Sequence, residues 1–221
     1  PPGEFLWARP TITQNVIAGT EGATGAVEIR ADALFTEPDQ SRLISPTTNG
    51  GKNWPAGAYS PRTKTMYFAM ANTCAWTTSA ATATATPEMI YAIATENVIA
   101  PDAGGKVGTL RSISVETGKE GWRYDQRAAL MALLATGGDL VFGGDVAGLL
   151  RAFDATTGEV LWQFGLGASV TGHPVTFAVN GKQYVAVSTG RSNVTGGLTR
   201  LAPEAAPAES QNKLFVFALP N

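Results

Sequence analysis

Apolar and polar residues alternate along short stretches of this chain, and turn-forming residues separate the stretches. The clearest pair lies in residues 174–188 (PVTFAVNGKQYVAVS), where two alternating runs flank Asn180 and Gly181, a dipeptide typical of tight hairpins. Two further hairpins are predicted in the same way, at residues 58–72 and 134–144. No 11-residue window combines helical periodicity with capping residues, so the pattern predicts an all-β fold and excludes an α/β fold.

A fifteen-residue pattern occurs twice, forty residues apart. GTLRSISVETGKEGW (108–122) and GLLRAFDATTGEVLW (148–162) are identical at six positions. Each copy predicts two strands joined by a Thr-Gly turn, with a Trp on the second strand. GEFLW (3–7) matches the end of the same pattern and is predicted to be the last strand of an earlier unit. Four strands in about 40 residues make one blade of a β-propeller, which is the predicted architecture.

Three tryptophans occupy the same place in these repeats: Trp7, Trp122 and Trp162. A large ring at a fixed position suits the seam between neighbouring blades, where the indole N–H would donate to a backbone carbonyl. Stacking of these rings on a ligand is the alternative interpretation.

The repeats cover only part of a ring. Propellers close with 4 to 8 blades, because an open fan would expose sheet edges. We therefore expect residues 1–221 to be roughly three blades of a single propeller domain, with the other blades in a partner chain or lost by cleavage. The side chains of residues 77–86 (TTSAATATAT) are too small to fill a core, so this segment predicts an inserted surface loop. The loop either has no function of its own or forms part of the rim of a substrate funnel.

Composition excludes some function classes. Sixteen Lys and Arg against 18 Asp and Glu give a net charge of −2, and no basic run occurs, which argues against a nucleic-acid partner. No apolar stretch approaches the roughly 20 residues that span a bilayer. Cys74 is predicted to be a buried, inert thiol. His173, the one histidine, is predicted to be a hydrogen-bonded residue at a strand start rather than a general base.

Longer stretches of the chain resemble the eight-bladed quinoprotein alcohol dehydrogenases, which use pyrroloquinoline quinone (PQQ). The Thr-Gly-x-x-x-Trp repeats are similar to their tryptophan-docking motif. More specific resemblances are Gly-x-Asn-Trp-Pro with its following hairpin (50–74), the signature of the penultimate blade (135–164) and the final hairpin (173–190). The resemblance implies that this chain is the C-terminal portion of such a propeller, with the N-terminal part as a second chain.

The resemblance also implies a set of site residues. Asn53 matches the family's Asn that hydrogen-bonds the quinone, Trp54 follows it, and Asn193 is assigned to the same cofactor site. A side-chain amide that donates to a carbonyl polarises it, which suits this chemistry. From the residues alone, Asn53 could instead cap a turn and Trp54 fill core. The calcium or lanthanide ligands, the catalytic Asp and the adjacent-cysteine disulfide of the family belong to the missing part, so no catalytic or metal residue is expected in this chain.

Two stretches depart from the family pattern. Leu130 stands where many members carry Trp or Asn near the cofactor, and residues 191–194 (RSNV) replace the Gly-Gly-Trp of methanol-oxidising members. We therefore expect an alcohol bulkier than methanol to be oxidised to an aldehyde or ketone, with electrons passed to a cytochrome c or similar acceptor in the periplasm. The competing hypothesis is a PQQ-free propeller that serves as an assembly scaffold or binding platform.

Overall fold

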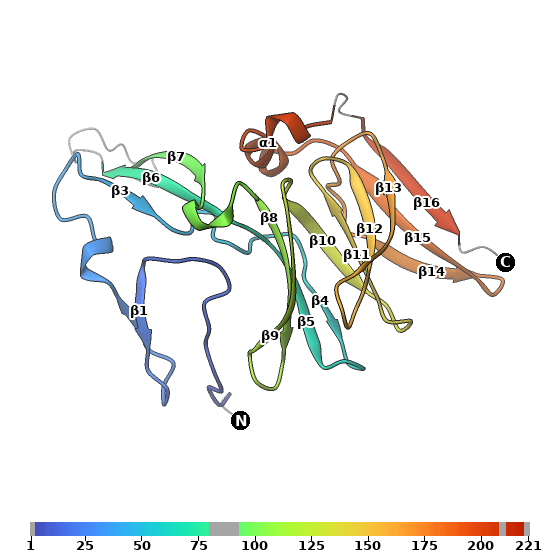
Figure 1. The fold of residues 1–221 in the computed structure, drawn as a ribbon, viewed down its shortest axis with the longest axis horizontal. Helices are drawn as coiled ribbons and strands as arrows, with labels where there is room; N and C mark the ends of the chain where they lie inside the picture. The colour runs from blue at the N-terminus through green and yellow to red at the C-terminus, as the bar shows by residue number, and fades with distance from the viewer. Residues whose placement is uncertain (1–2, 80–92, 208–210, 219–221) are drawn as a thin grey trace. The chain divides into compact units, whose positions relative to one another are not determined.

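The computed structural model describes residues 3–79, 93–207 and 211–218, most of them in antiparallel strands (Figure 1). The chain divides into two compact units. The first comprises residues 1–51 and 72–105, and the second comprises residues 52–71 and 106–221. The all-β propeller class predicted from the alternating pattern is confirmed by sheets in which every strand pairs antiparallel to its neighbours.

The first unit contains two small sheets. One pairs two strands and the other has the order β3-β6-β7. The strands and 3-10 helices of this unit are β1 (Ile17–Thr20), β2 (Val27–Ile29), η1 (Ala31–Ala33), β3 (Ser41–Ile44), β6 (Thr73–Ser79), β7 (Ile93–Ile99) and η3 (Pro101–Ala103).

Two predictions for this unit are wrong in part. Thr77–Ser79 do not begin a surface loop but end strand β6, because this strand pairs with β3 on one side and β7 on the other, and Thr77 is buried. The rest of the predicted loop, residues 80–86, lies outside the described residues. Residues 3–7, predicted as a strand, form no strand here, since no neighbouring strand pairs with them in the described chain.

The second unit contains three sheets that follow one another in chain order (Figure 1). Two have four described strands, in the orders β4-β5-β8-β9 and β10-β11-β12-β13, and the third has three, β14-β15-β16. We call them the first, second and third sheets. Their strands are β4 (Ala58–Ser60), β5 (Thr65–Ala71), β8 (Gly108–Ser114), β9 (Glu120–Gln126), β10 (Leu130–Ala135), β11 (Leu140–Asp145), β12 (Leu149–Asp154), β13 (Val160–Gly165), β14 (Val175–Val179), β15 (Lys182–Thr189) and β16 (Lys213–Ala218).

The predicted hairpins and repeats have the expected local geometry. Gly118 and Gly158 of the two Thr-Gly turns have φ of 65° and 76°, which only glycine adopts without strain. Asn180 and Gly181 both have positive φ, as a two-residue hairpin turn requires. The connection between β15 and β16 contains a short helix, α1 (Asn193–Thr199), and the 3-10 turn η4 (Pro203–Ala205).

The first and second sheets pack face to face through one apolar cluster, with Tyr67 and Leu110 on one side and Leu133, Val141 and Phe153 on the other. Burying each of these side chains stabilises the fold by roughly 1.5–3 kcal/mol relative to leaving it in water. This cluster is the core of the second unit and defines what we call the first seam.

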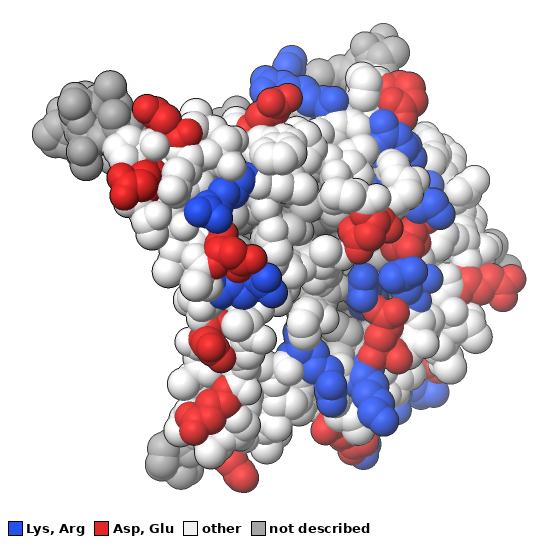
Figure 2. Space-filling view, turned by 60° about the vertical axis from the view of Figure 1, so that its left-hand side comes forward, with Lys and Arg blue, Asp and Glu red and all other residues white. Residues whose placement is uncertain are grey.

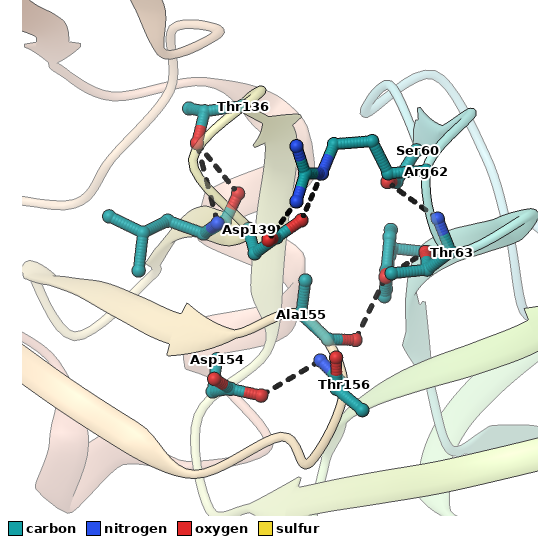
Figure 3. Close-up of polar contacts among 10 residues, drawn as sticks. Ser60, Arg62, Thr63, Thr136, Asp139, Asp154, Ala155 and Thr156 are labelled. Carbon is teal, nitrogen blue, oxygen red and sulfur yellow. Dashed lines mark hydrogen bonds and ion pairs between the residues drawn. The ribbon is translucent and has the colours of Figure 1, made fainter.

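Trp122 closes the first seam with a hydrogen bond. Its Nε1 donates to the carbonyl of Ala155 in the second sheet at 3.0 Å, and its ring lies 5.7 Å from the ring of Tyr67. The Tyr67 hydroxyl donates to the same carbonyl at 2.8 Å. Near these contacts, Arg62 forms a two-point ion pair with Asp139 (Figure 3). The structural interpretation of Trp122 is therefore confirmed.

Candidate functional site

The Asn53 loop, residues 52–55, leads into β4, the first strand of the first sheet. The neighbouring β10 is the first strand of the second sheet, and the amide of Leu133 on β10 donates to the carbonyl of Ala56 at 2.9 Å. The loop is thus held where the first strands of two adjacent sheets meet. In a propeller the first strand of each blade is the one that lies next to the central axis.

Backbone contacts fix the orientation of Asn53. Its side-chain Oδ1 accepts a hydrogen bond from the amide of Trp54 at 2.7 Å. An Asn side chain donates only through Nδ2, so a hydrogen bond from Asn53 to a carbonyl acceptor would have to come from that atom. The hydrogen bond from the Trp54 amide orients the Asn53 side chain against the backbone of its own loop.

Lys52 braces this loop from one side. Its Nζ donates to the carbonyl of Asn53 at 2.5 Å and also to the carbonyl of Pro55. Partial burial lowers the pKa of Lys52 below its ordinary value. The Lys52 ammonium group thus binds the carbonyls at both ends of the Asn53–Pro55 segment.

Trp54 does not fill core. Its side chain is 88% exposed in the described chain. An indole of this size on a surface is uncommon, and a flat exposed ring suits stacking against a planar partner. The residues of this chain therefore do not bury Trp54.

Asn193 is the first residue of α1, in the connection between β15 and β16. Ser192 caps this helix: its hydroxyl accepts from the amide of Thr195 at 3.1 Å, and Thr195 Oγ1 accepts from the amide of Ser192 at 2.9 Å. The same connection is anchored further on by an ion pair between Arg127 and Glu204, 2.5 Å from Nε to Oε1. Asn193 and the Asn53 loop thus lie on separate elements of the second unit.

Leu130 is not an open wall of a site. The expectation that Leu130 lies near the cofactor and changes the substrate pocket is wrong. Leu130 is 4% exposed and belongs to the apolar cluster of the first seam. Its side chain faces the core because β10 is packed against the first sheet, so a change of residue type there alters packing rather than an exposed surface.

A buried ion pair was missed by sequence reasoning. Asp145 is 1% exposed, and its Oδ2 accepts from Arg151 Nη1 at 2.7 Å and from Gln126 Nε2 at 3.2 Å. Its Oδ1 accepts from the amide of Leu149 at 2.9 Å. Both carboxylate oxygens of this buried residue are engaged, so Asp145 holds the β11–β12 turn in place. The only signal in the sequence was the Arg shared by both repeats.

Metal-ligand and charged groups add little to the site. The part of the chain that the structure describes holds no group of three or more His, Cys, Asp or Glu placed to bind a metal. Cys74 is fully buried, with Sγ 3.0 Å from Ser45 Oγ, while His173 is exposed.

No helix among the described residues is long and apolar enough to cross a membrane. On the face shown in Figure 2, Lys and Arg are interspersed with Asp and Glu.

Comparison with known proteins identifies relatives. Residues 105–185 match the family model described as the β-propeller domain of glucose/ethanol/alcohol dehydrogenases, named for PQQ. The chain is 33% identical over 204 residues to lupanine 17-hydroxylase [cytochrome c] of a Pseudomonas species, covering 90% of this chain and 29% of that protein. It is 32% identical to the quinoprotein ethanol dehydrogenase of Pseudomonas putida, covering 80% of this chain and 28% of the relative.

A solved structure has the same fold. A europium-containing methanol dehydrogenase superposes with a TM-score of 0.83 at 25% identity, over 97% of this chain and 41% of that chain. The chain thus spans about three-tenths of the length of the curated relatives that it matches. Residues 1–221 are a homologue of one part of the PQQ-dependent quinoprotein alcohol dehydrogenases, the part that forms propeller blades.

Proposed function

We propose that this chain is part of a PQQ-dependent dehydrogenase that oxidises an alcohol to an aldehyde or ketone. The observation that carries the proposal is the Asn53 loop, which combines an oriented amide with an exposed indole beside the first strands of two adjacent sheets. Relatives named as quinoprotein alcohol dehydrogenases support it.

The residues of the loop fit a planar cofactor that carries carbonyl groups. Asn53 Nδ2 would donate to a carbonyl oxygen, and the Trp54 ring offers a flat apolar face. When bound, PQQ would supply the two-electron acceptor for alcohol oxidation. Asn53 would then stabilise negative charge on a carbonyl oxygen of the cofactor, and the Lys52 contacts would keep the loop rigid enough for that donor to be preorganised. Asn193 is proposed as a further cofactor contact.

The remaining parts of the proposal lie outside the described residues. The calcium or lanthanide ion, the catalytic Asp and the rest of the propeller would come from the part of the protein beyond residues 1–221. A cytochrome c or similar protein would accept the electrons, an assignment supported by one relative whose name includes cytochrome c. A periplasmic location is proposed with it. An alcohol bulkier than methanol remains a prediction that rests on residues 191–194 alone, since Leu130 lies in core.

The test is Asn53→Ala in the complete holoenzyme. Loss of one preorganised donor is expected to lower turnover by about 100-fold or more. Cofactor occupancy is measured in parallel from the absorbance spectrum, and Asn53→Asp is expected to be at least as harmful because a carboxylate repels a reduced quinone oxygen. Asn180→Gly, which removes an amide from a distant turn at φ 51°, is the matched control and should retain wild-type turnover.

Two results would contradict the proposal. Wild-type turnover of Asn53→Ala at full occupancy would show that Asn53 is a turn residue only. A complete protein that binds no PQQ, with or without Asn53, would favour the scaffold hypothesis.

A further inference from the structure

A long connection joins two neighbouring strands of the third sheet. β15 and β16 pair with each other, yet residues 190–212 separate them in the chain, whereas Asn180 and Gly181 alone join β14 to β15. Connections between paired strands are usually short, and longer ones on a rigid scaffold often carry function. We call residues 191–206, which contain α1 and η4, the insert.

The two ends of this connection are fixed to each other at the sheet. The amide of Gly190 donates to the carbonyl of Ser169 at 2.9 Å. Thr189 Oγ1 donates to the carbonyl of Gln211 at 2.9 Å, which joins the start of the connection to its end. A Cβ at Gly190 would lie 2.6 Å from Asn212 Oδ1, so the chain leaves and re-enters the sheet at one place. The insert therefore has a closed base, as an Ω-loop has.

The polar groups of the insert bond to one another. Thr195 is 2% exposed, and its Oγ1 donates to the carbonyl of Ser192 at 3.0 Å and accepts from the amide of Ser192 at 2.9 Å. Thr199 Oγ1 donates to the carbonyl of Thr195 at 2.9 Å. A segment whose buried polar groups find their partners internally can move as a unit, because no group loses its partner when the segment shifts.

One ion pair ties the insert to another part of the second unit. Arg127 lies in the connection between the first and second sheets, and Glu204 lies in η4 of the insert. The distance is 2.5 Å from Nε to Oε1 and 3.3 Å from Nη2 to Oε2. Among the residues that the structure describes, this pair is the polar contact between the insert and the rest of the chain.

The strength of this tether follows from its exposure. The side chains of Arg127 and Glu204 are 40% and 59% exposed. An exposed ion pair contributes so little free energy that its loss changes the ratio of two states by no more than about fivefold. The pair therefore favours one position of the insert without locking it there.

The insert lies at the same end of the sheets as the Asn53 loop. β15 runs antiparallel to β14, so the insert leaves the third sheet at the end where the first strand of that sheet begins. In the first sheet, β4, β5, β8 and β9 are antiparallel in turn, so β9 ends where β4 begins.

Arg127 follows β9 at this end, and the Asn53 loop precedes β4 there. In Figure 1, α1 lies at one end of the sheets and the turn between β8 and β9 lies at the other. The ion pair thus holds the insert at the end of the second unit where the proposed cofactor residues lie.

We propose that the insert is a lid beside the alcohol site, that the Arg127–Glu204 pair holds it closed, and that the closed lid limits the size of the alcohol. This inference rests on the proposed function. Small alcohols pass the closed lid, whereas bulky alcohols enter only when it is open. The apparent kcat/KM for a bulky alcohol therefore follows the open fraction of the lid, and that for a small alcohol does not.

The test compares benzyl alcohol with ethanol in the complete holoenzyme. Arg127→Ala removes the tether and should raise the ratio of kcat/KM for benzyl alcohol to kcat/KM for ethanol by about two- to fivefold. High salt should raise the same ratio in the unmodified protein, because it screens an exposed pair, and should leave Arg127→Ala unchanged.

Exchange of the two charges separates the ion pair from the individual residues. Arg127→Glu and Glu204→Arg should each raise the ratio, and the double variant, in which the pair is re-formed with its charges exchanged, should return toward the original ratio. A purely structural role of either residue would not give this recovery.

Arg62→Ala is the matched control. Arg62 and Asp139 also form an exposed two-point pair, with both distances at 3.0 Å, and this pair joins the first and second sheets without contacting the insert. Its loss should leave the ratio of the two kcat/KM values unchanged.

Hydroxyl-radical footprinting measures lid opening without any turnover. Ala202 is 1% exposed, so this part of the insert is covered in the closed position. Oxidation of the neighbouring Leu201 should become faster in Arg127→Ala and slow again in the charge-exchanged double variant.

The possible failures are distinct. An unmodified protein that oxidises neither alcohol would refute the proposed function, and the lid over an alcohol site with it. In an active protein, an unchanged ratio in Arg127→Ala, no recovery in the double variant, an equal rise in Arg62→Ala, or unchanged oxidation of Leu201 would each overturn the lid and leave the proposed function standing.

Discussion

Replacing Gly158 with Ala tests the first seam more directly than removing any large side chain does. Gly158 has φ of 76°, and its amide donates to the carbonyl of Asp154 at 2.9 Å in the Thr-Gly turn. A Cβ at this position would lie 2.5 Å from Cε3 of Trp122 and 2.6 Å from Cδ2. The substitution therefore destabilises the fold in two ways. It strains the backbone, and the new Cβ overlaps the Trp122 ring, which its hydrogen bond to Ala155 holds in place.

The two costs can be separated by a matched glycine. Gly181 has φ of 77°, and a Cβ there would meet nothing within 4 Å. Gly181→Ala should therefore report backbone strain alone, about 1–2 kcal/mol of unfolding free energy. Gly158→Ala adds the overlap with Trp122, and overpacking of this kind costs about 1–3 kcal/mol more. We expect Gly158→Ala to lose about 2–5 kcal/mol in total.

Urea unfolding of the complete protein measures both variants, with the midpoint and the m-value determined together. Trp122→Leu provides room beside Gly158, so the double variant should lose less free energy than the sum of the two single losses, by about 1–2 kcal/mol. Equal losses for Gly158→Ala and Gly181→Ala, with additive effects in the double variant, would refute the packing of the turn against the Trp122 ring.

Further predictions concern the same region, each measured as unfolding free energy of the complete protein. Trp122→Ala should lose about 3–5 kcal/mol without changing substrate preference, and loss of cofactor binding at unchanged stability would contradict the seam interpretation. Tyr67→Phe removes one of two donors to a shared carbonyl and should lose about 1 kcal/mol; a neutral result would show that this hydroxyl bond contributes nothing. Arg62→Ala breaks the exposed pair with Asp139 and should lose no more than about 1 kcal/mol, with the loss shrinking at high salt. Backbone hydrogen bonds from the turn that follows lower the pKa of Asp154, so the stabilisation from this carboxylate is present above its unfolded pKa of about 4 and lost as pH falls through the lower folded value. Asp154→Asn should therefore reduce the acid sensitivity of unfolding, and an unchanged pH profile would contradict this.

The sequence by itself determined the local structure of most of the chain. Asn180-Gly181 and the two Thr-Gly turns require positive φ, and alternating residues on either side leave little choice but antiparallel hairpins. Six identities between two repeats were enough to predict repeated sheets, and the Gly-x-Asn-Trp-Pro segment singled out the Asn53 loop. These features are local, because each depends on a few neighbouring residues and their dihedral angles.

Only the tertiary structure decided what those residues face. Leu130 lies in core because β10 packs against the first sheet, and Thr77 is strand rather than loop because β3 and β7 pair with β6 on both sides. Trp122 and Trp162 occupy the same repeat position, yet Gly158 of the next sheet lies against the Trp122 ring, whereas Trp162 is 38% exposed in the described chain. Burial of a side chain depends on contacts from distant parts of the chain, and a repeat pattern, which is local, cannot specify which of those contacts are present.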